Sequence, residues 1–182
     1  MPNRPARPFS NFLTIAIIAT LFFLMGMDEP RSAFAQVQLA RPSGDVILEV
    51  TGKIEQTNRN GRAVFDRQML EKIGMTTVRT STPWTDGVLE FEGVLLRDLL
   101  SHCGAIGETI HAIAWNDYVM DIPVDDAMDY AVLLALKADG TPFSARDKGP
   151  IWIIYPLDDH RELRGRLTER KMVWQLKELH VR

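Results

Sequence analysis

The hydrophobic positions of this chain follow two patterns, one before Gln36 and another after it. From Phe9 to Met27 the chain carries no charge, and two arginines at positions 4 and 7 precede this apolar run. Ala33-Phe34-Ala35 then supplies small residues with Ala-x-Ala spacing. These three features are typical of a secretory signal peptide. We therefore expect cleavage after Ala35 and export to the periplasm. The alternative is an uncleaved membrane anchor, because the run approaches the ~18 apolar residues that span a bilayer.

After Gln36 the apolar positions come in short runs separated by turn-forming residues. The runs that are β-branched or alternate with polar residues predict strands at 45–51, 76–80, 88–91, 111–114, 118–122, 151–155 and 172–179. Asp66 is expected to cap a helix that runs to Ile73. A leucine stripe predicts a second helix from Leu95 to Cys103. The segment 125–136 fits either a helix or a strand. This mixture of short strands and few helices predicts an α+β domain.

We expect the chain to have three parts: a signal peptide at 1–35, a flexible N-terminal segment at 36–44, and one domain at 45–182.

The composition limits the possible functions of the chain without identifying one. The formal net charge of −3 gives no reason to expect a nucleic-acid partner. Cys103 is the only cysteine, so no internal disulfide can form. Because it lies on the leucine stripe, we expect it to be a buried structural residue.

Several common catalytic and metal-binding patterns are absent from the sequence. The four histidines and one cysteine have neither zinc-finger spacing nor helical i, i+4 spacing. No Gly-x-Ser-x-Gly motif and no glycine-rich phosphate loop occurs. These absences count against an ordinary hydrolase or nucleotide enzyme, although a triad can also assemble from distant residues.

Three polar and aromatic segments are the candidates for a binding site. They are Thr80-Ser81-Thr82-Pro83-Trp84, Trp115-Asn116-Asp117-Tyr118 and Arg146-Asp147-Lys148-Gly149-Pro150. Taken singly, each is more often a turn than a site. Together they offer flat aromatic faces, amide and carboxylate partners, and positive charge. This combination suits a planar, polar heterocycle.

Four motifs in a fixed order carry a family resemblance. They are the segment 92–100 (EGVLLRDLL), the turn 139–142 (DGTP), the strand 149–156 (GPIWIIYP) and the closing segment 173–176 (VWQL). In this order they resemble the sulfite-oxidase-type molybdopterin-binding domain, and the resemblance spans about residues 46–181. It implies an α+β fold of mixed sheets with a few short helices.

Three departures from the family pattern bear on function. The family's metal-ligating cysteine precedes the 92–100 motif, but residues 77–84 contain no cysteine here. Trp152 stands where the family has an arginine, and Val173 where it has a lysine. The resemblance therefore implies that the metal anchor and much of the phosphate anchor are missing, and no molybdenum is expected.

The segments 82–87 (TPWTDG), 116–118 (NDY) and 147–150 (DKGP) resemble a small exported subgroup of this family. This resemblance implies binding of a simple pterin without metal, by a protein that is a partner of membrane signalling proteins. The implied function is a non-catalytic periplasmic pterin-binding protein. The implied ligand-binding residues are Thr80, Thr82, Trp84, Trp115, Asn116, Asp117, Tyr118, Arg146 and Lys148.

Within that set, Asp117 suits the hydrogen-bond-donating edge of a pterin. Trp84, Trp115 and Tyr118 are alternative stacking partners for its ring. Two other functions stay open. One is a molybdenum-cofactor-dependent oxidoreductase or a subunit of one, and the other is a scaffold that binds only protein.

Overall fold

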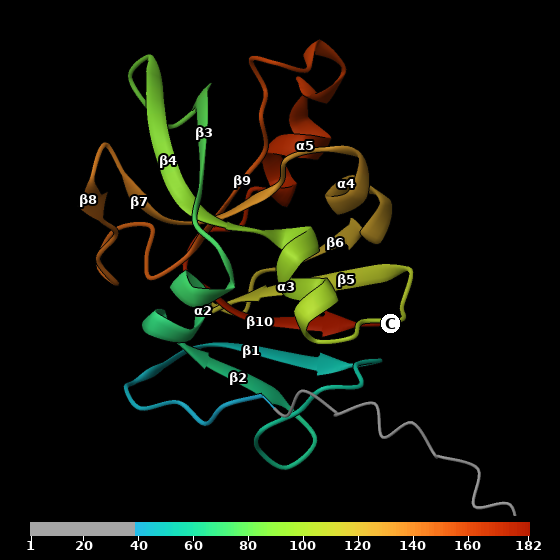
Figure 1. Cartoon of the computed structure of the whole chain (residues 1–182). Helices are drawn as coiled ribbons and strands as arrows, with labels where there is room; N and C mark the ends of the chain where they lie inside the picture. Colours follow the sequence, from blue (N-terminus) through green and yellow to red (C-terminus); the bar gives the residue numbers. More distant parts are fainter. Residues whose placement is uncertain (1–38) are drawn as a thin grey trace, which may run out of the picture. The chain divides into compact units, whose positions relative to one another are not determined.

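Two five-stranded sheets share one hydrophobic core in this computed structural model, which describes residues 39–182 (Figure 1). The predicted signal peptide and its cleavage site lie outside the described residues. The first sheet has the order β2-β1-β10-β5-β6, with β1 and β10 parallel and the other pairs antiparallel. Its strands are β1 (Val46–Gly52), β2 (Ala63–Asp66), β5 (Thr109–Ala114), β6 (Val119–Pro123) and β10 (Leu176–Val181).

The second sheet is antiparallel throughout, with the order β3-β4-β7-β8 and with β9 also paired to β7. Its strands are β3 (Thr76–Ser81), β4 (Val88–Leu95), β7 (Leu133–Ala138), β8 (Thr141–Pro142) and β9 (Trp152–Ile154). The helices are α2 (Arg67–Ile73), α3 (Leu96–His102), α4 (Val124–Asp129), α5 (Arg166–Lys171) and the 3₁₀ helix η1 (Arg161–Leu163). The predicted α+β class is confirmed.

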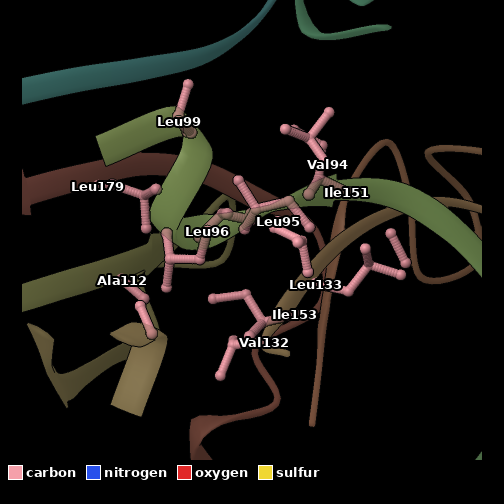
Figure 2. Packing of buried hydrophobic residues seen from close by; sticks show 14 of the residues in the cluster. Val94, Leu95, Leu96, Leu99, Ala112, Val132, Leu133, Ile151, Ile153 and Leu179 are labelled. Carbon is pink, nitrogen blue, oxygen red and sulfur yellow. The ribbon is translucent and has the colours of Figure 1, made fainter. Parts of the chain in front are cut away.

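Helix α3 anchors the core between the sheets. Leu96, Leu99 and Leu100 are at most 1% exposed. Figure 2 shows α3 side chains among residues of both sheets, with Leu179 of β10 and Leu133 of β7 in the same cluster. The leucine stripe therefore predicted the packing of this helix correctly. Among the described residues, no helix combines the length and apolar character needed to cross a bilayer.

The predicted cap of α2 is confirmed. Asp66 Oδ1 accepts a hydrogen bond from the Met69 amide at 2.8 Å. Its other oxygen, Oδ2, accepts from the amides of Ser43 and Gly44 at 2.7 and 2.9 Å. These bonds favour the ionised carboxylate and lower the pKa of Asp66 from 3.8 to about 2. Within the segment 36–44, Leu39 is also buried.

Two predicted boundaries were wrong, at Leu95 and at the start of the last strand, and one open choice was resolved, all where tertiary pairing competes with local pattern. Leu95 belongs to β4 rather than to the helix, because it pairs with Leu133 of β7. The ambiguous segment 125–136 contains both alternatives, since α4 ends at Asp129 and β7 begins at Leu133. The last strand begins at 176 rather than 172, and the Val173 carbonyl instead accepts from the Ile153 amide at 2.9 Å.

Candidate functional site

A pocket of about 420 Å³ lies where the two sheets and α5 meet. It is bounded by the turn after β3, the end of β5 and its turn into β6, helix α5, and the segment that leads into β10. The lining residues are Trp84, Ala114, Asn116, Tyr118, Arg166, Glu169, Arg170, Met172, Val173 and Trp174. Its volume lies within the range of small-molecule sites in proteins.

Tryptophans form the apolar wall of this pocket. Trp84 and Trp174 pack edge to face, with ring centroids 5.2 Å apart and planes at 88°. Both rings also contact Trp152, which is 1% exposed and whose Nε1 donates to the Met172 carbonyl at 3.0 Å. The exposed indole of Trp84 therefore rests on a fixed aromatic base.

The turn that presents Trp84 is built by two threonines. The Thr82 amide donates to Thr85 Oγ1 at 3.1 Å, and the Trp84 amide donates to Thr82 Oγ1 at 3.2 Å. Hydroxyls that bond backbone amides in this way stabilise a tight turn. Thr82 is 7% exposed and is not one of the lining residues, so it positions Trp84 from behind.

The turn between β5 and β6 supplies an amide and a phenol to the pocket. Asn116 Oδ1 accepts a hydrogen bond from the backbone amide of Tyr118 at 3.1 Å, which forms an Asx turn. The side-chain nitrogen of Asn116 stays available to donate to a ligand. Between Asn116 and Tyr118, Asp117 has a φ of 62°, a left-handed conformation that aspartate tolerates better than most residues. Tyr118 Oη donates to the Arg170 carbonyl at 3.1 Å and so connects this turn to α5.

Helix α5 supplies the charged wall. Arg166 and Arg170 lie one turn apart, a spacing at which two like charges repel. Within residues 39–182, neither guanidinium makes a side-chain hydrogen bond or an ion pair. Glu169 lies between them and also lines the pocket. The wall therefore offers two guanidinium groups that can donate to oxygen atoms and one carboxylate that can accept from N–H groups.

One ion pair fastens the end of α5 to α4. Lys171 Nζ lies 2.7 Å from Asp126 Oδ2, and the two side chains are 12% and 17% exposed. Tyr155 Oη donates to the same carboxylate oxygen at 2.7 Å. Burial is the main cause that raises the pKa of Tyr155, and the hydrogen bond to Asp126 adds to it. The phenol therefore stays protonated and donates to Asp126. No residue of α5 itself is buried, so this pair is the main side-chain anchor of the helix.

The structure brings together only part of the site predicted from the sequence. Trp84, Asn116 and Tyr118 line the pocket. Asp117 does not: it is exposed on the neighbouring surface, and its Oδ1 lies 2.8 Å from Lys177 Nζ. That hydrogen bond and charge lower the pKa of Asp117. Trp115 is 61% exposed and lies beside the same lysine, whose Nζ is 5.9 Å from the indole centroid.

The remaining predicted residues also lie outside the lining. Thr80 is fully buried in β3, where its Oγ1 accepts from the Asp158 amide at 3.2 Å. Lys148 lies over the Trp152 ring, with Nζ 5.3 Å from its centroid. Arg146 is exposed in the loop between β8 and β9. Thr80 and Lys148 thus support the walls rather than face the pocket.

The charged wall was not predicted from the sequence. Arg166, Glu169 and Arg170 lie on a helix that no apolar stripe predicts, since four of its six residues are charged. The segment does consist largely of good helix formers, which is the one signal that could have located it. Trp174 belongs to the segment 173–176, which carries the family resemblance but was not predicted to be part of the site.

No metal centre is apparent in the described part of the chain. Residues 39–182 contain no group of three or more His, Cys, Asp or Glu side chains arranged to hold an ion. Cys103 is fully buried at the end of α3, as predicted, and burial raises the pKa of its thiol to about 12. It is not one of the pocket residues.

The chain matches the family model described as "Oxidoreductase molybdopterin binding domain" over residues 56–157, more than half of its length. A similar solved structure is the sulfane dehydrogenase SoxCD from Paracoccus pantotrophus. The TM-score is 0.57 at 20% identity, over 79% of this chain and 40% of that one. The chain thus spans less than half of that neighbour, and the likeness shows the fold. The predicted sulfite-oxidase-type fold is confirmed. No curated protein matches the chain in sequence.

Proposed function

The chain belongs to the oxidoreductase molybdopterin-binding domain family, and from that premise we propose that it binds a pterin in the pocket beside α5 without using it for molybdenum catalysis. The observation that carries the proposal is the pairing of a tryptophan wall with a hydrogen-bonding wall. A pterin has a flat ring for the first and polar edges for the second.

The residues present fit the organic part of the cofactor. Trp84, Trp174 and Tyr118 offer aromatic faces, and Asn116 offers an amide. The carboxylate of Glu169 suits the 2-amino and N3–H edge of the ring, because a carboxylate accepts two parallel hydrogen bonds. On this proposal Glu169 takes the role that the sequence assigned to Asp117. Arg166 and Arg170 then meet ring oxygens or an oxygen-bearing substituent.

The same residues do not fit the metal. Molybdenum in this family needs a protein thiolate, and soft thiolate ligands are not replaced by amides or guanidinium groups. The only thiol, Cys103, is buried away from the pocket lining and is protonated at neutral pH. We therefore infer a pterin-binding domain with no metal step.

The second candidate is a molybdenum-cofactor-dependent oxidoreductase, or a subunit of one. The similarity to known proteins favours this second candidate, because the family description names oxidoreductases and the structural neighbour is a dehydrogenase. The two arginines of α5 also favour it in part, since they could replace the phosphate anchors lost at Trp152 and Val173. The two candidates differ in metal content, which is measurable.

Binding is tested by titrating the protein with 6-hydroxymethylpterin and following the quenching of pterin fluorescence. We expect Glu169→Gln and Asp117→Asn to separate the two proposed anchors. Loss of a charge-assisted partner costs about 2–5 kcal/mol, at least ~30-fold in Kd. Glu169→Gln should show that loss and Asp117→Asn should not. The reverse result would show that Asp117, the anchor predicted from the sequence, binds the pterin. If Trp84→Ala left the pterin affinity unchanged, the pocket would not be the binding site.

Metal content separates the two candidates. Protein from a host that makes the molybdenum cofactor should contain far less than one molybdenum per chain by elemental analysis. One molybdenum per chain would establish the oxidoreductase instead. In the same preparation, an intact mass equal to that of residues 36–182 would support export through a signal peptide that is cleaved before Gln36.

The biological role we propose is ligand sensing for the periplasmic domain of a membrane signalling protein. Exposed apolar residues near the pocket support a protein partner: Leu167 on α5 is 62% exposed and Val119 on β6 is 49% exposed. A photo-crosslinker at Leu167 should capture a membrane protein in cells, and Trp84→Ala should change the yield. The same crosslinking yield with and without Trp84→Ala would contradict a sensing role.

A further inference from the structure

A row of polar side chains crosses the first sheet on its solvent face, away from the pocket lining. Thr51 of β1 pairs with His180 of β10, which pairs with His111 of β5, which pairs with Asp121 of β6. Directly paired residues place their side chains on the same face of a sheet. The four strands therefore present two imidazoles side by side, with a polar residue on each flank.

Each flanking residue engages the Nδ1 atom of its histidine. His111 Nδ1 is hydrogen-bonded to Asp121 Oδ1. His180 Nδ1 lies 2.8 Å from Thr51 Oγ1. Thr51 Oγ1 donates its single proton to Glu178 Oε1 at 2.6 Å, so it accepts the bond from His180 Nδ1–H.

These bonds fix the tautomer of both neutral rings. With Nδ1 protonated on each, Nε2 of each carries the lone pair. Within the described residues, neither Nε2 atom has a hydrogen-bond partner. A histidine that donates Nδ1–H to a carboxylate while Nε2 stays free is the usual arrangement of a metal-binding imidazole. His111 has such a carboxylate directly, and His180 has one through Thr51.

The two rings are close enough to share an ion. Their centroids are 6.1 Å apart and their planes are within 17° of parallel. Zinc binds imidazole nitrogen at about 2.0–2.1 Å, so the rings must tilt toward each other to converge on one ion. Side-chain rotation supplies that tilt, because the backbone pairing already places the residues opposite each other.

We propose that His111 and His180 bind one divalent transition-metal ion through their Nε2 atoms, with water at the remaining positions. Imidazole is a preferred ligand of Zn²⁺ and Cu²⁺. This is a two-histidine surface site, and it differs from an enclosed centre with three or more protein ligands. It is also independent of the proposed pterin pocket, since no residue is shared.

The test is calorimetric titration of untagged full chain with Zn²⁺. We expect one equivalent, and at least tenfold weaker binding in His111→Ala and in His180→Gln, which retains a side-chain amide for Thr51. His102→Ala and His160→Ala are matched controls that should bind like wild type, as should the pocket variant Trp84→Ala. Asp121→Asn should weaken Zn²⁺ binding by about 10–100-fold, because it removes the carboxylate that orients His111.

With Cu²⁺, electron paramagnetic resonance should show hyperfine coupling to imidazole nitrogen in the wild type and lose it in the doubly substituted His111→Ala/His180→Gln protein. Circular dichroism of each variant establishes that the fold is intact. Absence of Zn²⁺ binding in the wild type would overturn the proposal, and so would one equivalent that persists in the doubly substituted protein.

Discussion

Helices α3 and α5 are similar in length but are held in place by different forces. Neither begins with a side-chain cap. Helix α3 buries Leu96, Leu99 and Leu100, whereas α5 buries none of its residues. Helix α3 is therefore fixed by apolar area, and α5 by one partly buried ion pair and one hydrogen bond to a carbonyl. The contrast indicates that the core helix serves the fold and that the weakly anchored helix serves the pocket.

The strongest test of this contrast compares a leucine on each helix. Leu99 is fully buried and Leu167 is 62% exposed. Leu99→Ala should lower the free energy of unfolding by about 2–5 kcal/mol, because it removes packed methyl groups and leaves a cavity. Leu167→Ala should change it by less than about 0.5 kcal/mol. Urea denaturation measures both, and similar losses would mean that α5 packs more tightly than its exposure indicates.

The next test breaks the anchor of α5. Lys171→Met should cost about 2–3 kcal/mol, because it leaves a largely buried carboxylate at Asp126 with only Tyr155 as partner. Lys177→Met is the matched control, since its partner Asp117 is 87% exposed and such a pair contributes less than about 1 kcal/mol. We also expect Lys171→Met to weaken pterin binding. Unchanged binding would show that α5 holds its position without the pair.

Acid should remove the cap of α2 in a defined pH range. The pKa of Asp66 is lowered from 3.8 to about 2 in the folded chain, so its contribution is complete above pH 4 and is lost as the pH falls toward 2. Asp66→Ala should cost about 1–2 kcal/mol at pH 7, because the N-cap is lost. The difference from wild type should shrink between pH 4 and pH 2 in denaturation experiments. A constant difference would assign the effect to packing rather than to charge.

The smallest expected effect is at Cys103. Cys103→Ala should cost about 1 kcal/mol, because it opens a small cavity beside the leucines of α3. Pterin binding by the folded protein should be unchanged. If the variant folded normally but lost its ligand, the thiol would have a role in binding that its burial does not indicate.

The sequence by itself determined the elements whose patterns are local. The leucine stripe of α3, the Asp66 cap and the order of the family motifs were sufficient for the α+β fold. The polar and aromatic segments 80–84 and 115–118 also identified the aromatic and amide part of the pocket at Trp84, Asn116 and Tyr118. In each case the information lies within a few consecutive residues, either as periodicity or as turn chemistry.

Only the tertiary structure decided which polar residues face the pocket. Asp117 and Trp115 are adjacent in sequence to lining residues, yet they turn outward to Lys177. Arg166, Glu169 and Arg170 come from a charged segment without an apolar stripe, and an ion pair to α4 holds that segment against the pocket. The histidine pair likewise depends on the register of β5 and β10, which joins residues far apart in the chain. Long-range pairing and the direction of each side chain leave no periodic signal in the sequence, so these features could be found only in the folded molecule.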